Sequence, residues 1–401
     1  MSDSATTVVV GAGAAGLMAA IWAARAGQKV VVLESTAQAG KKILISGGGR
    51  CNLLPSVIDV NDYYSNSSDN VIKRLFRTWP LEQVQMFFEY EVDVPLQLED
   101  ETGKLFPSAQ KAIVVRDALQ NELLNLGGEI RFNHKVTDVK KVGNEFILAC
   151  GDNVVNATKL VLATGGKSVP NTGSDGFGYE IARRMGHSNL PNYPALVPLA
   201  TNEGLLTDLS GISLRVEWRT VKNDKTLEVG VNDLLFTHHG FSGPAILDAS
   251  HWVVRDKADL IINFTQLSAE EWRQRFIDEP AKTANGILSD IVPARLAKAL
   301  LEKAGVKHDD RVGNLPAEKR KVFIEVISNY KLDITGNRGL AVAEVTGGGV
   351  PLDEVNLSTL ESKKTPGLYL CGEILDVIGR IGGYNFYWAF VSARLAGEST
   401  K

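Results

Sequence analysis

Cysteine is scarce in this chain of 401 residues, which contains only Cys51, Cys150 and Cys371. The three lie far apart, and no CxxC pair or Cys/His cluster has the spacing of a zinc site, so we expect no metal. A disulfide framework is equally unexpected, which favours a reducing, cytoplasmic location. Cys51 follows three glycines and has no other cysteine near it in sequence. We interpret it as a small buried thiol and keep a redox-active thiol as the alternative.

Basic runs and long apolar segments are also missing. No run of Lys and Arg exceeds three, and the formal net charge is −4. The composition therefore predicts neither nucleic acid nor an anionic membrane as a partner, and favours a small-molecule substrate. No apolar stretch approaches the roughly 20 residues of a membrane-spanning helix. The first apolar run follows no basic segment and ends at glycines, so we expect a strand there and not a signal peptide.

Glycine, in contrast, is abundant, with 38 residues that fall in clusters. The valines at 8–10 run into Gly11, Gly13 and Gly16, which form G-x-G-x-x-G, and a second apolar run ends at Glu34. Gly11 permits a tight strand-to-helix turn, Gly13 admits a pyrophosphate, and Gly16 lets helix and strand pack closely. Glu34 is spaced to bind the ribose hydroxyls of an adenosine. The pattern predicts a dinucleotide site and, taken alone, leaves FAD and NAD open.

The order of the later segments favours FAD. Residues 129–132 are typical of a third strand, residues 135–155 of a short antiparallel meander, and residues 159–166 of a buried return strand that ends in a glycine turn. A simple NAD domain would repeat strand–helix units without the meander. We therefore predict an α/β fold built on a FAD-binding Rossmann-type domain of the glutathione-reductase-like kind.

A shift in composition predicts an insertion within that domain. Prolines cluster between residues 191 and 198, after which strand-like alternation and then helical periodicity follow. We expect the first part of the FAD-binding domain at 1–194, an inserted β-barrel-like and helical substrate domain at 195–335, and the C-terminal part of the FAD-binding domain at 336–401. Within the insertion, residues 268–271 have the pattern of a capping box that begins a helix.

Two further glycine clusters are expected to contact the cofactor. Residues 47–49 are three consecutive glycines, which mark backbone that lies against a flat or charged group; a flexible surface loop is the alternative. Gly382 and Gly383 precede an apolar helix at 385–395. The free N–H groups and positive dipole end of that helix would stabilise negative charge at the flavin C2 carbonyl. The alternative is an ordinary capped core helix.

In that order, residues 10–16, 46–52, 236–244 and 371–385 resemble the BaiN/YhiN-type NAD(P)/FAD-dependent oxidoreductases, often labelled aminoacetone-oxidase-family flavoproteins. The similarity spans nearly the whole chain, and it implies non-covalently bound FAD and an inserted substrate domain. The resemblance also implies a set of FAD neighbours, which are Gly11, Gly13, Ala15, Gly16, Glu34, Lys42, Gly48, Gly49, Arg50, Asn52, Val136, Thr164, Gly165, Gly372, Glu373, Gly383, Tyr384 and Asn385. It does not imply a substrate.

Two residues are predicted to take part in the chemistry. His238 occupies the histidine position of the family motif and would exchange a proton near neutral pH. The alternative is that it holds the backbone of the inserted domain through hydrogen bonds. Arg380 would lie near the flavin or bind an acidic substrate through two parallel hydrogen bonds. The alternative for Arg380 is a surface position in a loop.

The predicted reaction is hydride transfer between FAD and a small or hydrophobic organic substrate, with NAD(P)H as the expected electron donor. No second complete G-x-G-x-x-G follows a strand, so a nicotinamide would visit the flavin transiently. Three alternatives stay open: an amine or alcohol oxidase that uses O₂, a tRNA-modifying protein, and a non-catalytic flavin-binding protein. The acidic net charge argues against RNA. The sequence does not give the oligomeric state.

Overall fold

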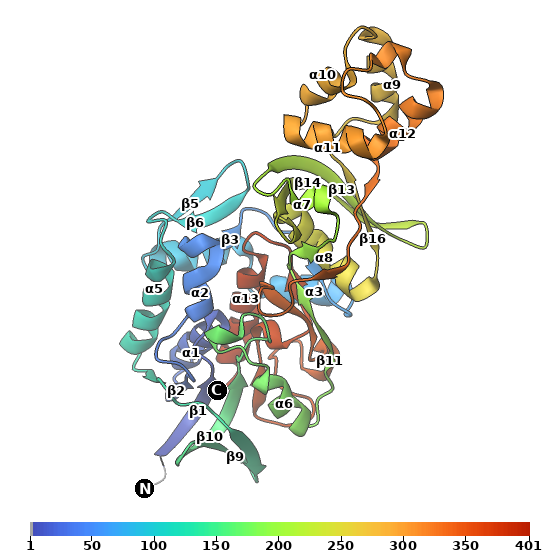
Figure 1. Cartoon of the computed structure of the whole chain (residues 1–401). Coiled ribbons are helices and arrows are strands. Elements are labelled where there is room, and N and C mark those ends of the chain that lie inside the picture. Colours follow the sequence, from blue (N-terminus) through green and yellow to red (C-terminus); the bar gives the residue numbers. More distant parts are fainter. Residues whose placement is uncertain (1–2) are drawn as a thin grey trace. The chain divides into compact units, whose positions relative to one another are not determined.

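The computed structural model describes residues 3–401, which divide into two compact units (Figure 1). Unit 1 consists of the described residues up to Tyr193 and of Glu344–Lys401, and unit 2 consists of Pro194–Ala343. We expected the insertion at 195–335, so the chain returns to unit 1 a few residues later than the composition suggested. Each unit has its own hydrophobic core.

Unit 1 is built on a seven-stranded sheet with the order β7-β2-β1-β10-β9-β8, and β20 also pairs with β10. Parallel pairing joins β7, β2, β1, β10 and β20, whereas β8 and β9 extend the sheet as an antiparallel meander. The Rossmann-type fold and the meander are therefore confirmed. The strands are β1 (Asp3–Val10), β2 (Val30–Leu33), β7 (Glu129–Arg131), β8 (Asp138–Val142), β9 (Glu145–Cys150), β10 (Asn153–Leu162) and β20 (Leu368–Leu370).

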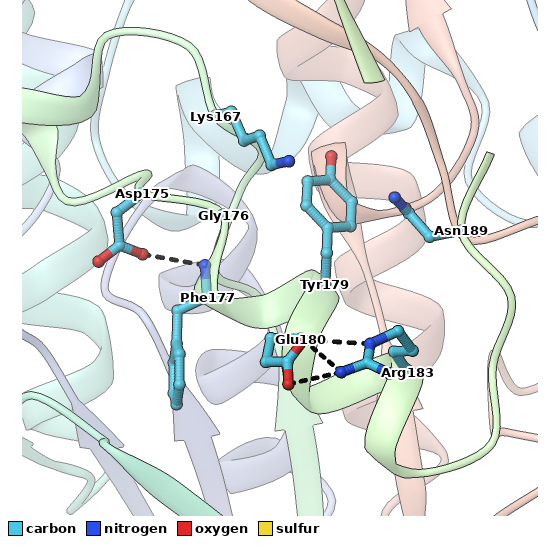
Figure 2. Close-up of a pocket in the computed structure, with 8 residues that line it drawn as sticks. All are labelled: Lys167, Asp175, Gly176, Phe177, Tyr179, Glu180, Arg183 and Asn189. Atoms are coloured by element: carbon cyan, nitrogen blue, oxygen red, sulfur yellow. Dashed lines mark hydrogen bonds and ion pairs between the residues drawn. The ribbon is translucent and has the colours of Figure 1, made fainter. Parts of the chain in front are cut away.

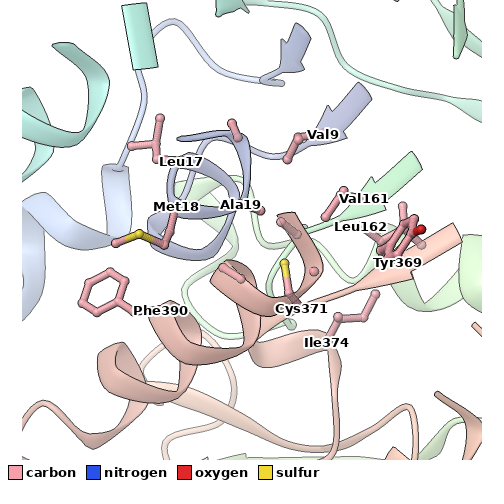
Figure 3. Close-up of a cluster of buried hydrophobic side chains, with 14 of the residues drawn as sticks. Val9, Leu17, Met18, Ala19, Val161, Leu162, Tyr369, Cys371, Ile374 and Phe390 are labelled. Carbon is pink, nitrogen blue, oxygen red and sulfur yellow. The ribbon is translucent and has the colours of Figure 1, made fainter. Parts of the chain in front are cut away.

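The central strands are parallel and buried, because their apolar runs are covered by helices. Helix α1 (Ala14–Arg25) packs closely against α13 (Tyr384–Glu398), which brings the C-terminus back to the first Rossmann helix. A Cβ placed on Gly397 would lie 2.3 Å from the Ala19 carbonyl oxygen, so this glycine permits the close approach. Figure 3 shows part of the core, with Phe390 of α13 near Met18 of α1.

The remaining elements of unit 1 surround this sheet. The helices include α2 (Lys41–Ile45), α3 (Asp69–Phe76), α4 (Leu81–Met86), α5 (Ala112–Asn125), α6 (Phe177–Arg184) and the short turns η1 (Ser46–Gly49), η3 (Phe87–Glu91) and η7 (Gly372–Ile374). A three-stranded sheet has the order β3 (Leu54–Pro55), β6 (Lys104–Pro107) and β5 (Leu96–Glu99). Two strand pairs are formed by β4 (Tyr63–Tyr64) with β21 (Ile378–Gly379) and by β11 (Leu190–Ala195) with β19 (Val345–Gly349).

Unit 2 contains an antiparallel sheet with the order β17-β16-β13-β14-β15-β12-β18. The sheet is open, whereas we expected a barrel-like arrangement. Its strands are β12 (Leu199–Ala200), β13 (Ser213–Lys222), β14 (Lys225–Thr237), β15 (Gly240–Ser242), β16 (Asp259–Asn263), β17 (Tyr330–Lys331) and β18 (Gly336–Asn337). Its helices are α7 (Gly204–Thr207), α8 (Pro244–Asp256), α9 (Ala269–Asp278), α10 (Ala284–Ser289), α11 (Ala294–Ala304) and α12 (Ala317–Ser328).

The predicted capping box of α9 is confirmed. The Ser268 side chain accepts a hydrogen bond from the Glu271 backbone N–H, and the Glu271 carboxylate accepts one from the Ser268 backbone N–H. Within residues 3–401, no helix is long and apolar enough to cross a membrane.

Candidate flavin site

The G-x-G-x-x-G segment forms the strand-to-helix turn between β1 and α1. Gly11 has a φ of +100°, and a Cβ there would lie 2.6 Å from the Ala163 carbonyl oxygen. A Cβ on Gly16 would lie 1.8 Å from the Gly11 carbonyl oxygen, so only glycine fits this contact. A Cβ on Gly13 would meet nothing within 4 Å. Gly13 also begins α1 without a side-chain cap, which leaves open space and N–H groups where a pyrophosphate would bind.

Glu34 lies at the carboxyl end of β2 and is 7% exposed. One carboxylate oxygen accepts a hydrogen bond from the Ala12 N–H at 2.8 Å, and the other accepts one from the Thr36 N–H at 2.8 Å. The Glu34 carbonyl oxygen accepts a hydrogen bond from the His134 N–H, two residues before the buried Val136. The structure thus brings Glu34 and the segment that contains Val136 together beside the glycine turn, as an adenosine site requires.

The return strand and the C-terminal segment complete this end of the sheet. Gly165 follows β10 and Thr164, and Gly372 opens η7 after β20. A Cβ on Gly372 would lie 2.7 Å from the Cβ of Ala15, so η7 lies against the first turn of α1. The Gly372 N–H donates to the Ser392 hydroxyl of α13 at 2.9 Å, which fixes the position of η7.

Lys42 and Glu373, which are far apart in sequence, form an ion pair with an Nζ–Oε2 distance of 2.9 Å. Lys42 Nζ also donates to Ser168 Oγ at 2.6 Å. Glu373 Oε1 accepts hydrogen bonds from Ser168 Oγ at 3.0 Å and from the Thr346 N–H at 2.9 Å. We call Lys42, Ser168, Thr346 and Glu373 the polar network. The network joins four segments of unit 1 that are distant in sequence. Because the Lys42–Glu373 pair is partly buried, water and salt screen its attraction less than that of a surface pair.

The three-glycine turn is a left-handed segment, with φ angles of 55°, 67° and 85° at Gly47, Gly48 and Gly49. A Cβ on Gly47 would lie 2.8 Å from the Asn52 backbone nitrogen. The Asn52 side-chain oxygen is buried and has no hydrogen-bond partner among the described residues. A buried amide oxygen without a donor is costly, so it fits a site that a bound cofactor completes.

Arg50 and Cys51, which follow the glycines, have structural surroundings. Arg50 lies over the Phe106 ring at 4.2 Å from its centroid, and its guanidinium pairs with Glu99 at 3.2 Å. It therefore holds the β5–β6 hairpin. Burial raises the pKa of the Cys51 thiol to about 12, although a hydrogen bond with Ser46 opposes the shift. A thiol with this pKa is protonated and unreactive near neutral pH.

Helix α13 begins at Gly383, which has a φ of +91° and no room for a side chain. A Cβ there would lie 2.6 Å from the Leu54 carbonyl carbon. No side chain caps the helix, so its first N–H groups remain available for an anionic group. Asn385 accepts a hydrogen bond from the Gly379 N–H and donates one to the Gly379 carbonyl, and the Tyr384 carbonyl accepts one from the Tyr63 hydroxyl. These contacts hold the preceding loop in place.

The two predicted chemical residues have different surroundings. The Arg380 N–H donates to the Asp62 carbonyl, and the Arg380 Nε lies 3.6 Å from the Asp62 carboxylate. Burial raises the pKa of Asp62, whereas the Arg380 charge opposes that shift. His238 is exposed in the turn between β14 and β15 of unit 2. A role for either residue in proton transfer or substrate binding stays a prediction.

A separate pocket of about 490 Å³ lies at the start of α6 in unit 1 (Figure 2). The Lys167 ammonium lies 5.7 Å from the centroid of the Tyr179 ring. The Tyr179 hydroxyl donates to the Glu373 carbonyl at 3.3 Å, so one wall of the pocket contacts the segment that carries the polar network. Glu180 is paired with Arg183. The pocket is lined by Lys167, Asp175, Gly176, Phe177, Tyr179, Glu180, Arg183 and Asn189.

The parallel sheet and the glycine turn before α1 form the Rossmann-type fold of FAD-dependent oxidoreductases. Residues 5–399 match the family model described as the HI0933-like protein Rossmann domain, and the chain belongs to this family. The resemblance to BaiN/YhiN-type flavoproteins is thereby confirmed.

Three relatives match over nearly their whole length. A "ribosomal RNA dihydrouridine synthase" of Haemophilus influenzae is 33% identical over 98% of both chains, and a protein of the same name from Escherichia coli is 32% identical over 96% of this chain and 95% of its own. A "3-dehydro-bile acid delta(4,6)-reductase" of Clostridium scindens is 30% identical over 98% of both chains.

Solved structures share the fold at low identity. A flavocytochrome c3 fumarate reductase is 15% identical with a TM-score of 0.50, over 100% of this chain and 78% of its own. A 3-ketosteroid delta1-dehydrogenase from Sterolibacterium denitrificans is 13% identical with a TM-score of 0.51, over 100% of this chain and 99% of its own.

Sequence reasoning missed several residues that the structure brings to this region. Ser168 and Thr346 donate hydrogen bonds to Glu373. Lys104 lies near Gly382, because a Cβ added to Gly382 would lie 3.7 Å from Lys104 Cε. Glycines near Ser168 and next to Thr346 indicate backbone–ligand contact, but nothing in the sequence pairs these two distant segments.

Proposed function

We propose that this protein is a FAD-dependent reductase that saturates a C=C bond conjugated to a carbonyl group, and that its substrate is a uracil base of ribosomal RNA. The observation that carries the proposal is the end-to-end match to three relatives whose names imply one type of chemistry. Dihydrouridine is made by reducing a C=C bond conjugated to a uracil carbonyl. A delta(4,6) reductase acting on a 3-dehydro-bile acid likewise reduces C=C bonds conjugated to a ketone.

The residues of unit 1 fit FAD, because the buried Asn52 side-chain oxygen has no hydrogen-bond partner within residues 3–401 and Gly13 borders open space. Gly13 and the start of α1 would hold the pyrophosphate, and Glu34 would bind the ribose. The uncapped N-terminus of α13 would stabilise negative charge on the flavin ring. When bound, the flavin supplies a hydride for the substrate carbon.

The composition argued against RNA, because the net charge is −4. Net charge describes the whole surface, and it does not exclude binding of one RNA element to one local region. We therefore give more weight to the two full-length relatives that share one RNA-directed name. A steroid-like enone is the second candidate substrate, and the bile-acid reductase favours it.

We further propose NADH or NADPH as the electron donor, which would reach the flavin transiently because no second G-x-G-x-x-G follows a strand. The competing proposal is an oxidase that delivers electrons to O₂. Both would use the same cofactor site.

Stopped-flow absorbance separates these proposals. The FAD-loaded protein is reduced without oxygen by NADH or NADPH and is then mixed with unmodified ribosomal RNA, with a 3-keto-4-ene steroid, or with O₂. We expect rapid flavin reoxidation and stoichiometric dihydrouridine with RNA. Rapid reoxidation by the steroid alone would assign the second substrate. Reoxidation by O₂ alone, or failure to take up FAD, would contradict a reductase.

A further inference from the structure

We propose that Lys42 is a positioning residue for FAD that acts through Glu373. Its ammonium group balances the negative charge of the Glu373 carboxylate, which would otherwise repel the diphosphate of the cofactor at the glycine turn before α1. The family resemblance implies both residues as FAD neighbours and does not relate one to the other. This inference rests on the FAD site of the proposed function, and it is independent of the substrate.

The Glu373 carboxylate lies close to the glycine turn. Glu373 follows Gly372, and a Cβ on Gly372 would lie 2.7 Å from the Ala15 Cβ in the first turn of α1. Glu373 Oε2 lies 4.0 Å from the place of a Gly165 Cβ. The residue before Gly165 has its Cα 3.4 Å from the place of a Gly11 Cβ. These contacts connect the carboxylate to the turn that is predicted to hold the diphosphate.

The Glu373 carboxylate also has a structural task, which accounts for an acid at this position. Its Oε1 atom accepts hydrogen bonds from Ser168 Oγ at 3.0 Å and from the Thr346 N–H at 2.9 Å. Ser168 and Thr346 are both fully buried, so their donors would be left without this acceptor at a cost in stability. The acid is therefore required for packing, although its charge is unfavourable beside an anionic ligand.

Lys42 is the cation that balances this charge. Its Nζ lies 2.9 Å from Glu373 Oε2, and the carboxylate has no other ion-pair partner within residues 3–401. The side chains of Lys42 and Glu373 are 27% and 17% exposed, so solvent screens their charges incompletely. Without the ammonium group, an unpaired negative charge would lie beside a diphosphate that carries two negative charges of its own.

The Lys42 ammonium is held inside the polar network. One N–H donates to Glu373 Oε2, and another donates to Ser168 Oγ at 2.6 Å. Two of its three donors are thus used within the protein. We therefore infer that Lys42 acts on the diphosphate by neutralising Glu373. Direct binding of a phosphate oxygen through the third donor is the competing explanation, and the test separates the two.

The test compares K42M, E373Q and the double variant K42M/E373Q. The matched control is K41M, because Lys41 is the neighbouring lysine of α2 and has no ion pair in the described part of the chain. Glutamine at position 373 keeps a carbonyl oxygen that can accept the hydrogen bonds from Ser168 and Thr346. Circular dichroism and the melting temperature of the FAD-free proteins first establish folding.

Fluorescence titration with FAD then gives the affinities. We expect K42M to lower FAD affinity about 10–100-fold, since an unpaired charge at this range repels the diphosphate strongly. K41M should stay within about twofold of the wild type, because an exposed lysine contributes little. The double variant should recover to within about threefold of E373Q, since Lys42 has no charge to balance once Glu373 is neutral.

Riboflavin and K42R separate an electrostatic role from a purely structural one. Riboflavin has no phosphate, so its affinity should be the same in K42M as in the wild type. K42R keeps the positive charge and should retain most of the FAD affinity, whereas K42M does not. If K42M alone does not fold, E373Q and K42M/E373Q are compared, and equal FAD affinities are expected.

Each contrary result has a definite meaning. A double variant that binds FAD as weakly as K42M, or more weakly than E373Q, would show direct binding by Lys42 and overturn its action through Glu373. Wild-type FAD affinity in K42M, or an equal loss of riboflavin, would also overturn the inference. A wild type that takes up no FAD would overturn the proposed function as well. A wild type that binds FAD and reduces neither RNA nor steroid would overturn the proposed function alone.

Discussion

At the scale of single residues, two glycines of one motif have different tasks. A Cβ on Gly16 would collide with the Gly11 carbonyl, whereas a Cβ on Gly13 would project into open space. Gly13 has a φ of −78°, which alanine adopts without strain. Gly16 is thus required by the fold, and Gly13 is required only by what binds beside it.

We expect Gly13→Ala to keep the thermal stability of the FAD-free protein, or raise it slightly because alanine reduces the entropy of the unfolded chain. FAD affinity should fall at least tenfold, because the methyl group would occupy pyrophosphate space. Gly16→Ala should lose about 1–3 kcal/mol of stability as well as FAD. Differential scanning fluorimetry and FAD titration measure both effects. Equal FAD affinity in wild type and Gly13→Ala would contradict a pyrophosphate at this turn.

His187 connects the end of α6 to the segment before β20. It is buried, with Nδ1 at 2.8 Å from Glu354 and Nε2 at 2.7 Å from Ser362. Ser362 Oγ also accepts two backbone N–H groups, so this serine has a structural role. Burial lowers the pKa of His187, and the charge of Lys364 adds to this, although Glu354 opposes it.

The lowered pKa of His187 in the folded chain determines how the free energy of unfolding changes with pH. Below the ordinary histidine pKa of about 6.5, His187 is protonated in the unfolded chain but still neutral in the folded chain. Protonation therefore favours the unfolded chain, and stability is lost as pH falls. We expect the melting temperature to drop between pH 7 and pH 5.5, and to drop less in His187→Gln. Glu354 titrates in a lower pH range. Parallel curves for the two proteins would show that His187 is not the titrating group.

At the scale of elements, the pairing of α1 with α13 closes unit 1, because the last helix packs on the first. The contact depends on a small residue, since Gly397 places backbone against the Ala19 carbonyl. Both predicted cofactor-binding helix ends, Gly13 of α1 and Gly383 of α13, belong to this pair. A change in its spacing would therefore move both ends of the cofactor site.

We expect Gly397→Ala to destabilise the protein by about 1–3 kcal/mol, the usual cost of adding a methyl group to a packed contact. Its Cβ would lie 2.3 Å from the Ala19 oxygen, so the helices must separate. Urea denaturation measures the effect. The matched control is Gly204→Ala, which adds a methyl group in open space. Gly305→Ala is less suitable as a control, because Gly305 has a φ of +63° that strains an alanine. Unchanged stability in Gly397→Ala would contradict the close packing.

At the scale of the whole molecule, the two units have separate hydrophobic cores. We expect residues 194–343 to fold alone, with a cooperative thermal transition by circular dichroism. We expect residues 1–193 joined to 344–401 by a short Gly/Ser linker to bind FAD, because every predicted cofactor residue lies in unit 1. A non-cooperative transition in the first fragment, or a colourless second one, would contradict this division.

The Rossmann strands, the meander and the last helix could be predicted because they depend on local signals, namely glycine spacing, β-branched runs and apolar periodicity. The polar network could not, because Lys42, Ser168 and Glu373 meet only through tertiary packing. Arg50 was predicted beside FAD from its motif, and its side chain contacts Phe106 and Glu99. Such contacts depend on neighbours that sequence spacing does not reveal.

We propose that this protein saturates a uracil base of ribosomal RNA with electrons from reduced FAD. The most direct test is nucleoside mass spectrometry of ribosomal RNA from cells that lack the gene, complemented with the wild type or with Gly13→Ala. We expect dihydrouridine to disappear from one ribosomal position on deletion, to return with the wild type, and to return weakly or not at all with Gly13→Ala. Identical dihydrouridine content in all strains would contradict it.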